Sequence, residues 1–90
     1  MNKNQIALAS LAMDLKRVAL GYHRGSITMA NRFLQEALKR RSEIDTTTVK
    51  PYVQKLLVKL DTLASEKDTG RIAERALMYS TLFQNASFYA

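Results

Sequence analysis

The sequence predicts an all-α protein, an antiparallel up-down-up-down four-helix bundle formed as a single domain by residues 1–90. Three observations lead to this fold class. Apolar residues recur at steps of three and four along four stretches, a spacing that aligns side chains on one face of a helix. No stretch shows the strict alternation, bounded by hairpin turn residues, that marks a strand. Linkers of about four to six residues require consecutive helices to return antiparallel.

The first helix is predicted over residues 4–22. Its core row steps by three and four through Leu8, Leu11, Leu15, Val18 and Tyr22. A second row, Ile6, Met13 and Leu20, steps by seven. We expect this row to widen the buried stripe, because a bundle helix contacts two neighbours.

A turn and a second helix follow. Gly21 and Gly25 can adopt the left-handed conformation common at helix ends, so the chain is expected to turn there. Ser26 is the expected N-cap of a helix over residues 27–43, with its hydroxyl accepting a bond from a first-turn amide. The residues at helical spacing along this segment are Ile27, Ala30, Phe33, Leu34, Ala37, Leu38, Arg41 and Ile44.

The third and fourth helices are predicted over residues 49–64 and 70–88. Pro51 belongs in the first turn of the third helix, where its missing amide costs little. The apolar row of that helix is Val49, Val53, Leu56, Leu60 and Leu63. Asp68 and Thr69 are the two candidates to cap the fourth helix. The core row of the fourth helix is Ile72, Ala76, Tyr79, Phe83 and Ala86.

Composition excludes several classes of protein. The chain contains no Cys and one His, which excludes a disulfide scaffold, a Cys-ligated zinc site and a thiol nucleophile. Its longest apolar run is far shorter than a membrane span. The short apolar stretch near the N-terminus runs into Asp14, Lys16 and Arg17 instead of a small-residue cleavage site. We therefore expect a cytoplasmic protein that does not associate with membranes.

No motif specifies a chemistry, so we expect no enzyme, no metal and no cofactor. The carboxylates form no Glu-x-x-His pair of the di-iron type, and no Gly-rich phosphate loop is present. The spacing of Arg17 and His23 resembles the Arg-x4–6-His signature of small helical HEPN-type ribonucleases, in which such a pair acts on the reacting ribose and phosphate. A histidine beside two glycines at a helix end favours a helix C-terminal cation instead. Asp14 is expected to pair with Arg17 or with a neighbouring helix.

The protein is basic, with a net charge of +6. Its densest cations, at residues 39–41, end the second predicted helix, where positive charge is favourable. A solvated face laced by ion pairs four residues apart, such as Arg32 with Glu36, accounts for this pattern. The alternative is a patch that contacts nucleic-acid phosphates. That patch would consist of Arg24, Arg32, Lys39, Arg40 and Arg41.

The C-terminal segment, residues 76–90, contains no charge and four of the seven aromatic residues. Several of its large apolar residues lie off the core row and are predicted to form a patch that another subunit or a protein partner covers. These residues are Leu77, Met78, Leu82, Phe88 and Tyr89. Residues 5–13 are likewise uncharged and are a second candidate for self-association.

These observations predict a homodimer that acts as a non-catalytic protein-interaction or regulatory module. Two alternatives stay open. One is a basic nucleic-acid-binding module. The other is an immunity-type or antitoxin-type protein that neutralises a partner, suggested by a general likeness to small, basic, helical-bundle immunity proteins.

Overall fold

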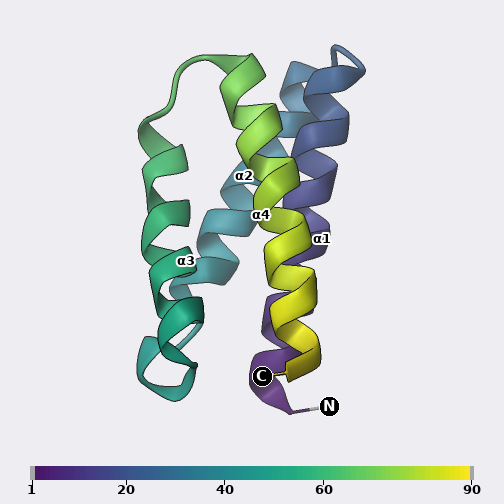
Figure 1. The fold of residues 1–90 in the computed structure, drawn as a ribbon. Helices are drawn as coiled ribbons and strands as arrows, with labels where there is room; N and C mark the ends of the chain where they lie inside the picture. The colour runs from purple at the N-terminus through teal and green to yellow at the C-terminus, as the bar shows by residue number, and fades with distance from the viewer. Residues whose placement is uncertain (1, 90) are drawn as a thin grey trace.

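The computed structural model describes residues 2–89 and contains four α-helices that run alternately up and down (Figure 1). Two short 3-10 helices, η1 and η2, flank α3. The elements are α1 (Lys3–His23), α2 (Ile27–Ser42), η1 (Thr46–Thr48), α3 (Pro51–Asp61), η2 (Thr62–Ser65) and α4 (Thr69–Tyr89). The predicted all-α bundle is confirmed, and no strand occurs in the described part of the chain.

Helix α1 is the centre of the packing. It lies antiparallel to both α4 and α2, and its contacts with α4 are the most extensive in the molecule. Helix α3 stands at the edge of the bundle beside α4 and makes far fewer backbone contacts with it (Figure 1). Small buried residues, among them Ala12, Ala19 and Ser80, let α1 and α4 approach closely.

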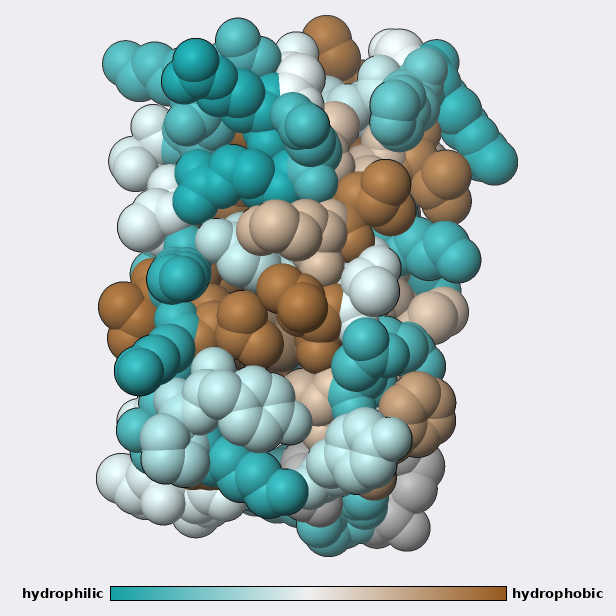
Figure 2. Space-filling view, viewed as in Figure 1, coloured by the Kyte–Doolittle hydropathy of each residue, from teal (hydrophilic) through white to brown (hydrophobic). Residues whose placement is uncertain are grey.

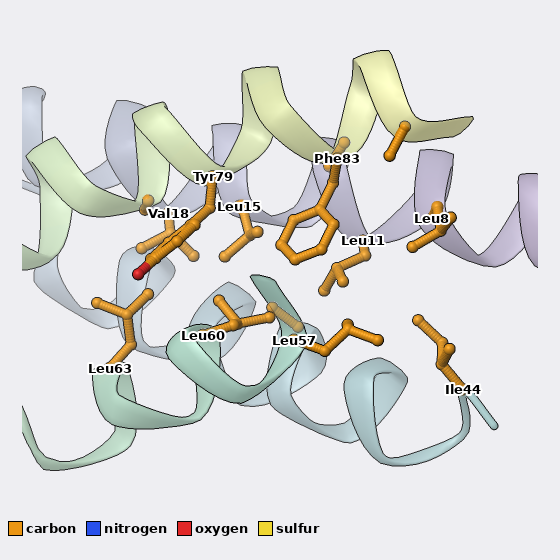
Figure 3. Close-up of a cluster of buried hydrophobic side chains, with 14 of the residues drawn as sticks. Leu8, Leu11, Leu15, Val18, Ile44, Leu57, Leu60, Leu63, Tyr79 and Phe83 are labelled. Atoms are coloured by element: carbon orange, nitrogen blue, oxygen red, sulfur yellow. The ribbon is translucent and has the colours of Figure 1, made fainter. Parts of the chain in front are cut away.

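The core is built from the rows that the spacing predicts for α1 and α4. All five predicted core residues of α4 are buried, as are Leu8, Leu11, Leu15 and Val18 of α1. Figure 3 shows Tyr79 and Phe83 pointing from α4 toward leucines of α3. Burial of this apolar surface contributes roughly 25 cal/mol per Å² and is the main stabilising term of a chain without disulfides.

Helix α3 differs from its prediction in both length and rotation. It begins at Pro51, which occupies the first helical position, and ends at Asp61, after which the chain tightens into η2. Leu57 is fully buried, whereas the predicted Leu56 is only half-buried. The two residues are about 100° apart on the helix, so a small rotation decides which of them faces the core.

The second apolar row of α1 is exposed, contrary to the expectation that it would be buried. Ile6, Met13 and Leu20 are 54%, 48% and 39% exposed. Both neighbours of α1 pack around the Leu8–Val18 row, and within residues 2–89 no helix covers the second row. Ile27, at the start of α2, is also exposed rather than in the core.

The two glycines of the first turn have different roles. Gly25 has φ +74° and ends α1 in a Schellman motif, in which the Ser26 amide donates to the Gly21 carbonyl at 2.9 Å and the Gly25 amide donates to the Tyr22 carbonyl. Gly21 is instead an interior residue of α1, buried against Ala30 of α2. Ser26 is the N-cap residue of α2, as predicted, but its side chain makes no capping hydrogen bond.

Candidate interaction surfaces

The five apolar residues of α4 predicted to form a patch are all exposed, by between 37% and 70%. Apolar side chains gather in the middle of the face on which α4 lies in front, and polar residues surround them (Figure 2). Large exposed apolar groups on one element mark candidate interaction sites.

Helical spacing divides these five residues between two rows. Leu77 and Phe88 belong to a row, continued by Thr81 and Gln84, that faces α1. The second row consists of Met78, Leu82, Asn85 and Tyr89, and Leu82 and Tyr89 in it face α3. The single patch of the prediction is therefore divided: Leu77 and Phe88 belong to a surface toward α1, Leu82 and Tyr89 to a surface toward α3, and Met78 lines neither groove.

The first surface lies across α1 and α4. Met13 and Lys16 of α1 and Leu77 of α4 line a shallow groove of about 420 Å³ between the two helices. The seven-residue steps of α1 extend its apolar part toward both ends of that helix. We call this surface the α1/α4 outer face. Met13 and Leu77 line its groove, and helical spacing places Ile6, Leu20 and Phe88, which are also exposed, on the rows that continue it.

The second surface is a groove of about 480 Å³ between α3 and α4, here called the α3/α4 groove. Its lining is Tyr52, Lys55, Leu56, Lys59, Leu82, Asn85, Ala86 and Tyr89. Of the α3 residues in this groove, only Leu56 was predicted, as a core residue, whereas Tyr52, Lys55 and Lys59 were not predicted. The step of four and three from Tyr52 through Leu56 to Lys59 could have indicated them, because it places an aromatic residue beside the core row.

The predicted phosphate-binding patch is divided by ion pairs. The Arg40 Nε donates to Asp14 Oδ2 at 2.9 Å, which ties α2 to α1. Arg41 pairs with Asp61 at 3.1 Å and also donates to the Leu57 carbonyl, which ties α2 to α3. The two arginines thus point to opposite sides of α2. The other three members, Arg24, Arg32 and Lys39, are exposed.

Asp14 is a buried acid with two cationic partners. Besides Arg40, it has Arg17 at 3.5 Å, so its predicted pairing with Arg17 and with a neighbouring helix is confirmed. None of the predicted ion pairs along α2, such as Arg32 with Glu36, forms among residues 2–89. The acid on α1 therefore fixes the position of α2.

The structure places Arg17 and His23 on different sides of α1. The Arg17 guanidinium lies 5.4 Å from the ring centre of Phe33 in α2, in addition to its contact with Asp14. His23 lines a separate hollow with Glu74 and the first residues of α4. The two side chains therefore do not converge on one site.

Two groups have shifted pKa values. Burial raises the pKa of Tyr22, whose hydroxyl donates to the Asn31 side-chain carbonyl at 2.7 Å. Hydrogen bonds from the Thr47 side chain and then from the Thr47 amide lower the pKa of Asp45, the residue that caps η1. Tyr22 belongs to the contact between α1 and α2, and Asp45 belongs to the turn before η1. Neither group lines one of the two interaction surfaces.

Comparison of the chain with protein-family models, curated proteins and solved structures finds no match. Among residues 2–89, no helix has the length and apolar content to cross a membrane. Within the same range, no group of three or more His, Asp or Glu side chains is placed to hold a metal ion. The case for a function therefore rests on the geometry of the surfaces.

Proposed function

We propose that this protein is a non-catalytic protein-interaction module that self-associates through the α1/α4 outer face. The observation that carries the proposal is the exposure of five large apolar side chains, by 39% to 65%, on two adjacent helices. Isolated exposed apolar residues are common, but apolar residues clustered on a small monomer mark a surface that another molecule covers.

The spacing along α1 suits a two-fold pairing. Ile6, Met13 and Leu20 are evenly spaced, so two antiparallel copies of α1 that cross at Met13 place Ile6 of one copy against Leu20 of the other. A two-fold interface requires this kind of self-complementarity, in which the same patch serves both subunits. The same register sets Lys16 and Arg17 opposite the uncharged residues 9 and 10, so like charges do not meet.

The nucleic-acid alternative receives less support from the geometry. Two of its five cations, Arg40 and Arg41, are engaged in ion pairs that hold α2 in place. A phosphate would have to replace those contacts, and with them part of the packing of α2. The side chains of the α1/α4 outer face, in contrast, are already exposed, and none of the four ion pairs of residues 2–89 would have to break for a partner to cover them.

Sedimentation equilibrium of single-residue variants tests the proposal. Met13→Glu places a charge at the centre of the outer face and should convert a dimer into a monomer with unchanged helix content by circular dichroism. Val58→Glu is the matched control, because Val58 of α3 is 61% exposed and lies outside the outer face. A Met13→Glu variant that stays dimeric, or a wild-type protein that is monomeric throughout, would contradict the proposal.

A further inference from the structure

We propose that the α3/α4 groove binds an acidic amphipathic helix of a partner protein. This surface is separate from the α1/α4 outer face, and the inference does not depend on self-association. The groove combines an apolar floor, two lysines along one edge and an uncharged opposite edge.

The shape of the groove matches two turns of a helix. Its walls are two antiparallel rows with the same spacing of four and three residues, which are Tyr52, Leu56 and Lys59 on α3 and Leu82, Ala86 and Tyr89 on α4. Each row spans about 10 Å at 1.5 Å per residue. A helix that lies in such a groove inserts apolar side chains at positions i, i+3 or i+4, and i+7.

The groove is open because α3 packs loosely against this part of α4. Leu56 is only half-buried, and the small Ala86, which is 1% exposed, lines the floor of the groove with it. Tyr52 and Tyr89 stand at the same end of the groove and are 46% and 70% exposed. Tyrosines are enriched in interfaces because the ring buries apolar area while the hydroxyl keeps a polar partner.

Charge selects an acidic occupant. Lys55 and Lys59 are one turn apart on the α3 edge, and neither forms an ion pair within residues 2–89. Residues 76–90 contain no charge, so the α4 edge neither neutralises these lysines nor offers a cation of its own. An apolar helix flanked by Asp or Glu toward α3 complements this pattern, and a basic helix is repelled.

A second copy of this chain is a poor occupant of the groove. The exposed apolar row of α1, the element best suited to insert, is flanked by Lys16 and Arg17, and the one acid next to it, Asp14, is buried and already paired with Arg40 and Arg17. Inserting it would bring cations next to Lys55 and Lys59. The occupant is therefore expected to come from a different protein.

Selection from a displayed peptide library tests this inference. The probes are helices of about 16 residues with fixed apolar residues at i, i+3, i+4 and i+7 and with flanking positions randomised among Glu, Lys and Ala. Selected peptides are synthesised, and their affinity is measured by fluorescence anisotropy for the wild type, for Lys55→Glu/Lys59→Glu and for the matched control Lys3→Glu/Lys67→Glu. The control variant changes the net charge equally at two exposed lysines outside the groove.

We expect selection to enrich Glu, and we expect the groove variant to weaken binding by about tenfold or more while the control variant weakens it far less. Tyr89→Ser should also weaken binding. Selection that fails to enrich acidic helices, or equal losses in the two double variants, would overturn the inference.

Binding of dodecanoate that depends on Lys55 and Lys59, with no peptide selected, would identify a fatty acid as the ligand instead. Loss of the dimer in Lys55→Glu/Lys59→Glu would identify a second copy of this chain as the occupant of the groove. Peptide binding that persists in Met13→Glu would show that the groove binds its ligand independently of the proposed self-association.

Discussion

Substitution of Gly21 tests the contact between α1 and α2. A Cβ added at Gly21 would lie 2.9 Å from the backbone nitrogen, the Cα and the Cβ of Ala30. Carbon atoms in good contact are about 3.5–4.0 Å apart, so the two helices would have to separate by more than half an ångström. Overpacking of this kind costs about 1–3 kcal/mol. It outweighs the gain of roughly 0.5–1 kcal/mol that alanine brings to a helix interior.

We therefore expect Gly21→Ala to lower the free energy of unfolding by about 1–2 kcal/mol, equivalent to roughly 4–15 °C in Tm for a domain of this size. Thermal and urea unfolding followed by circular dichroism measure this change. The control is Gly70→Ala near the start of α4, where the nearest atom is a side-chain oxygen, Asp68 Oδ1 at 3.2 Å, which accepts from the Arg71 amide, and a smaller change than at Gly21 is expected. A Gly21→Ala protein as stable as the wild type, or more stable, would refute the proposed contact with Ala30.

Three further predictions concern the core, the buried acid and a tyrosine. Leu57→Ala should cost about 3 kcal/mol in urea unfolding because Leu57 is fully buried, and a loss below about 1 kcal/mol would contradict its place in the core. Asp14→Ala should lower the free energy of unfolding by about 1–2 kcal/mol, which is less than for a fully buried ion pair because the Arg40 side chain is 37% exposed. A double-mutant cycle with Arg40→Ala should show coupling between the two residues, and additive losses would argue against the ion pair. Burial raises the pKa of Tyr22 above its ordinary value of 10.0. The stability that this shift contributes to the folded protein is therefore complete below the ordinary pKa and is lost as the pH rises through the folded-state pKa. Absorbance titration should show one tyrosine that ionises late and is absent from Tyr22→Phe; unchanged curves would contradict the shift.

The sequence was sufficient to predict the large apolar residues of α4 that face the core, but not the small buried residues Ala73, Ser80 and Ser87. The row of α4 from Ile72 to Ala86 is uninterrupted, and α4 is buried along one side for its whole length, so periodicity alone determines burial. The same reasoning failed for Leu56 and Leu57. Both are leucines, and which one turns inward depends on how Pro51 starts α3 and how α4 crosses it. Local spacing does not contain that information.

Long-range packing accounts for the other differences. The Ile6, Met13 and Leu20 row has the spacing of a buried stripe, but no helix of residues 2–89 covers that side of α1. Gly21 has the composition signal of a turn, yet its role is to admit Ala30. Similarly, the sequence predicted the exposed apolar residues of α4. It could not show which of them lie toward α1 and which toward α3, because that depends on where those two helices pack.

Self-association through the α1/α4 outer face is the central claim, and the solution mass of the wild-type protein tests it most directly. Light scattering at about 50 and 200 mM salt, with and without a short mixed-sequence RNA or DNA duplex, distinguishes an apolar interface from a phosphate contact. We predict twice the chain mass of 10.2 kDa at both salt concentrations and no change when nucleic acid is added. A monomer at every protein concentration, or a nucleic-acid complex that dissociates as the salt rises, would contradict the account.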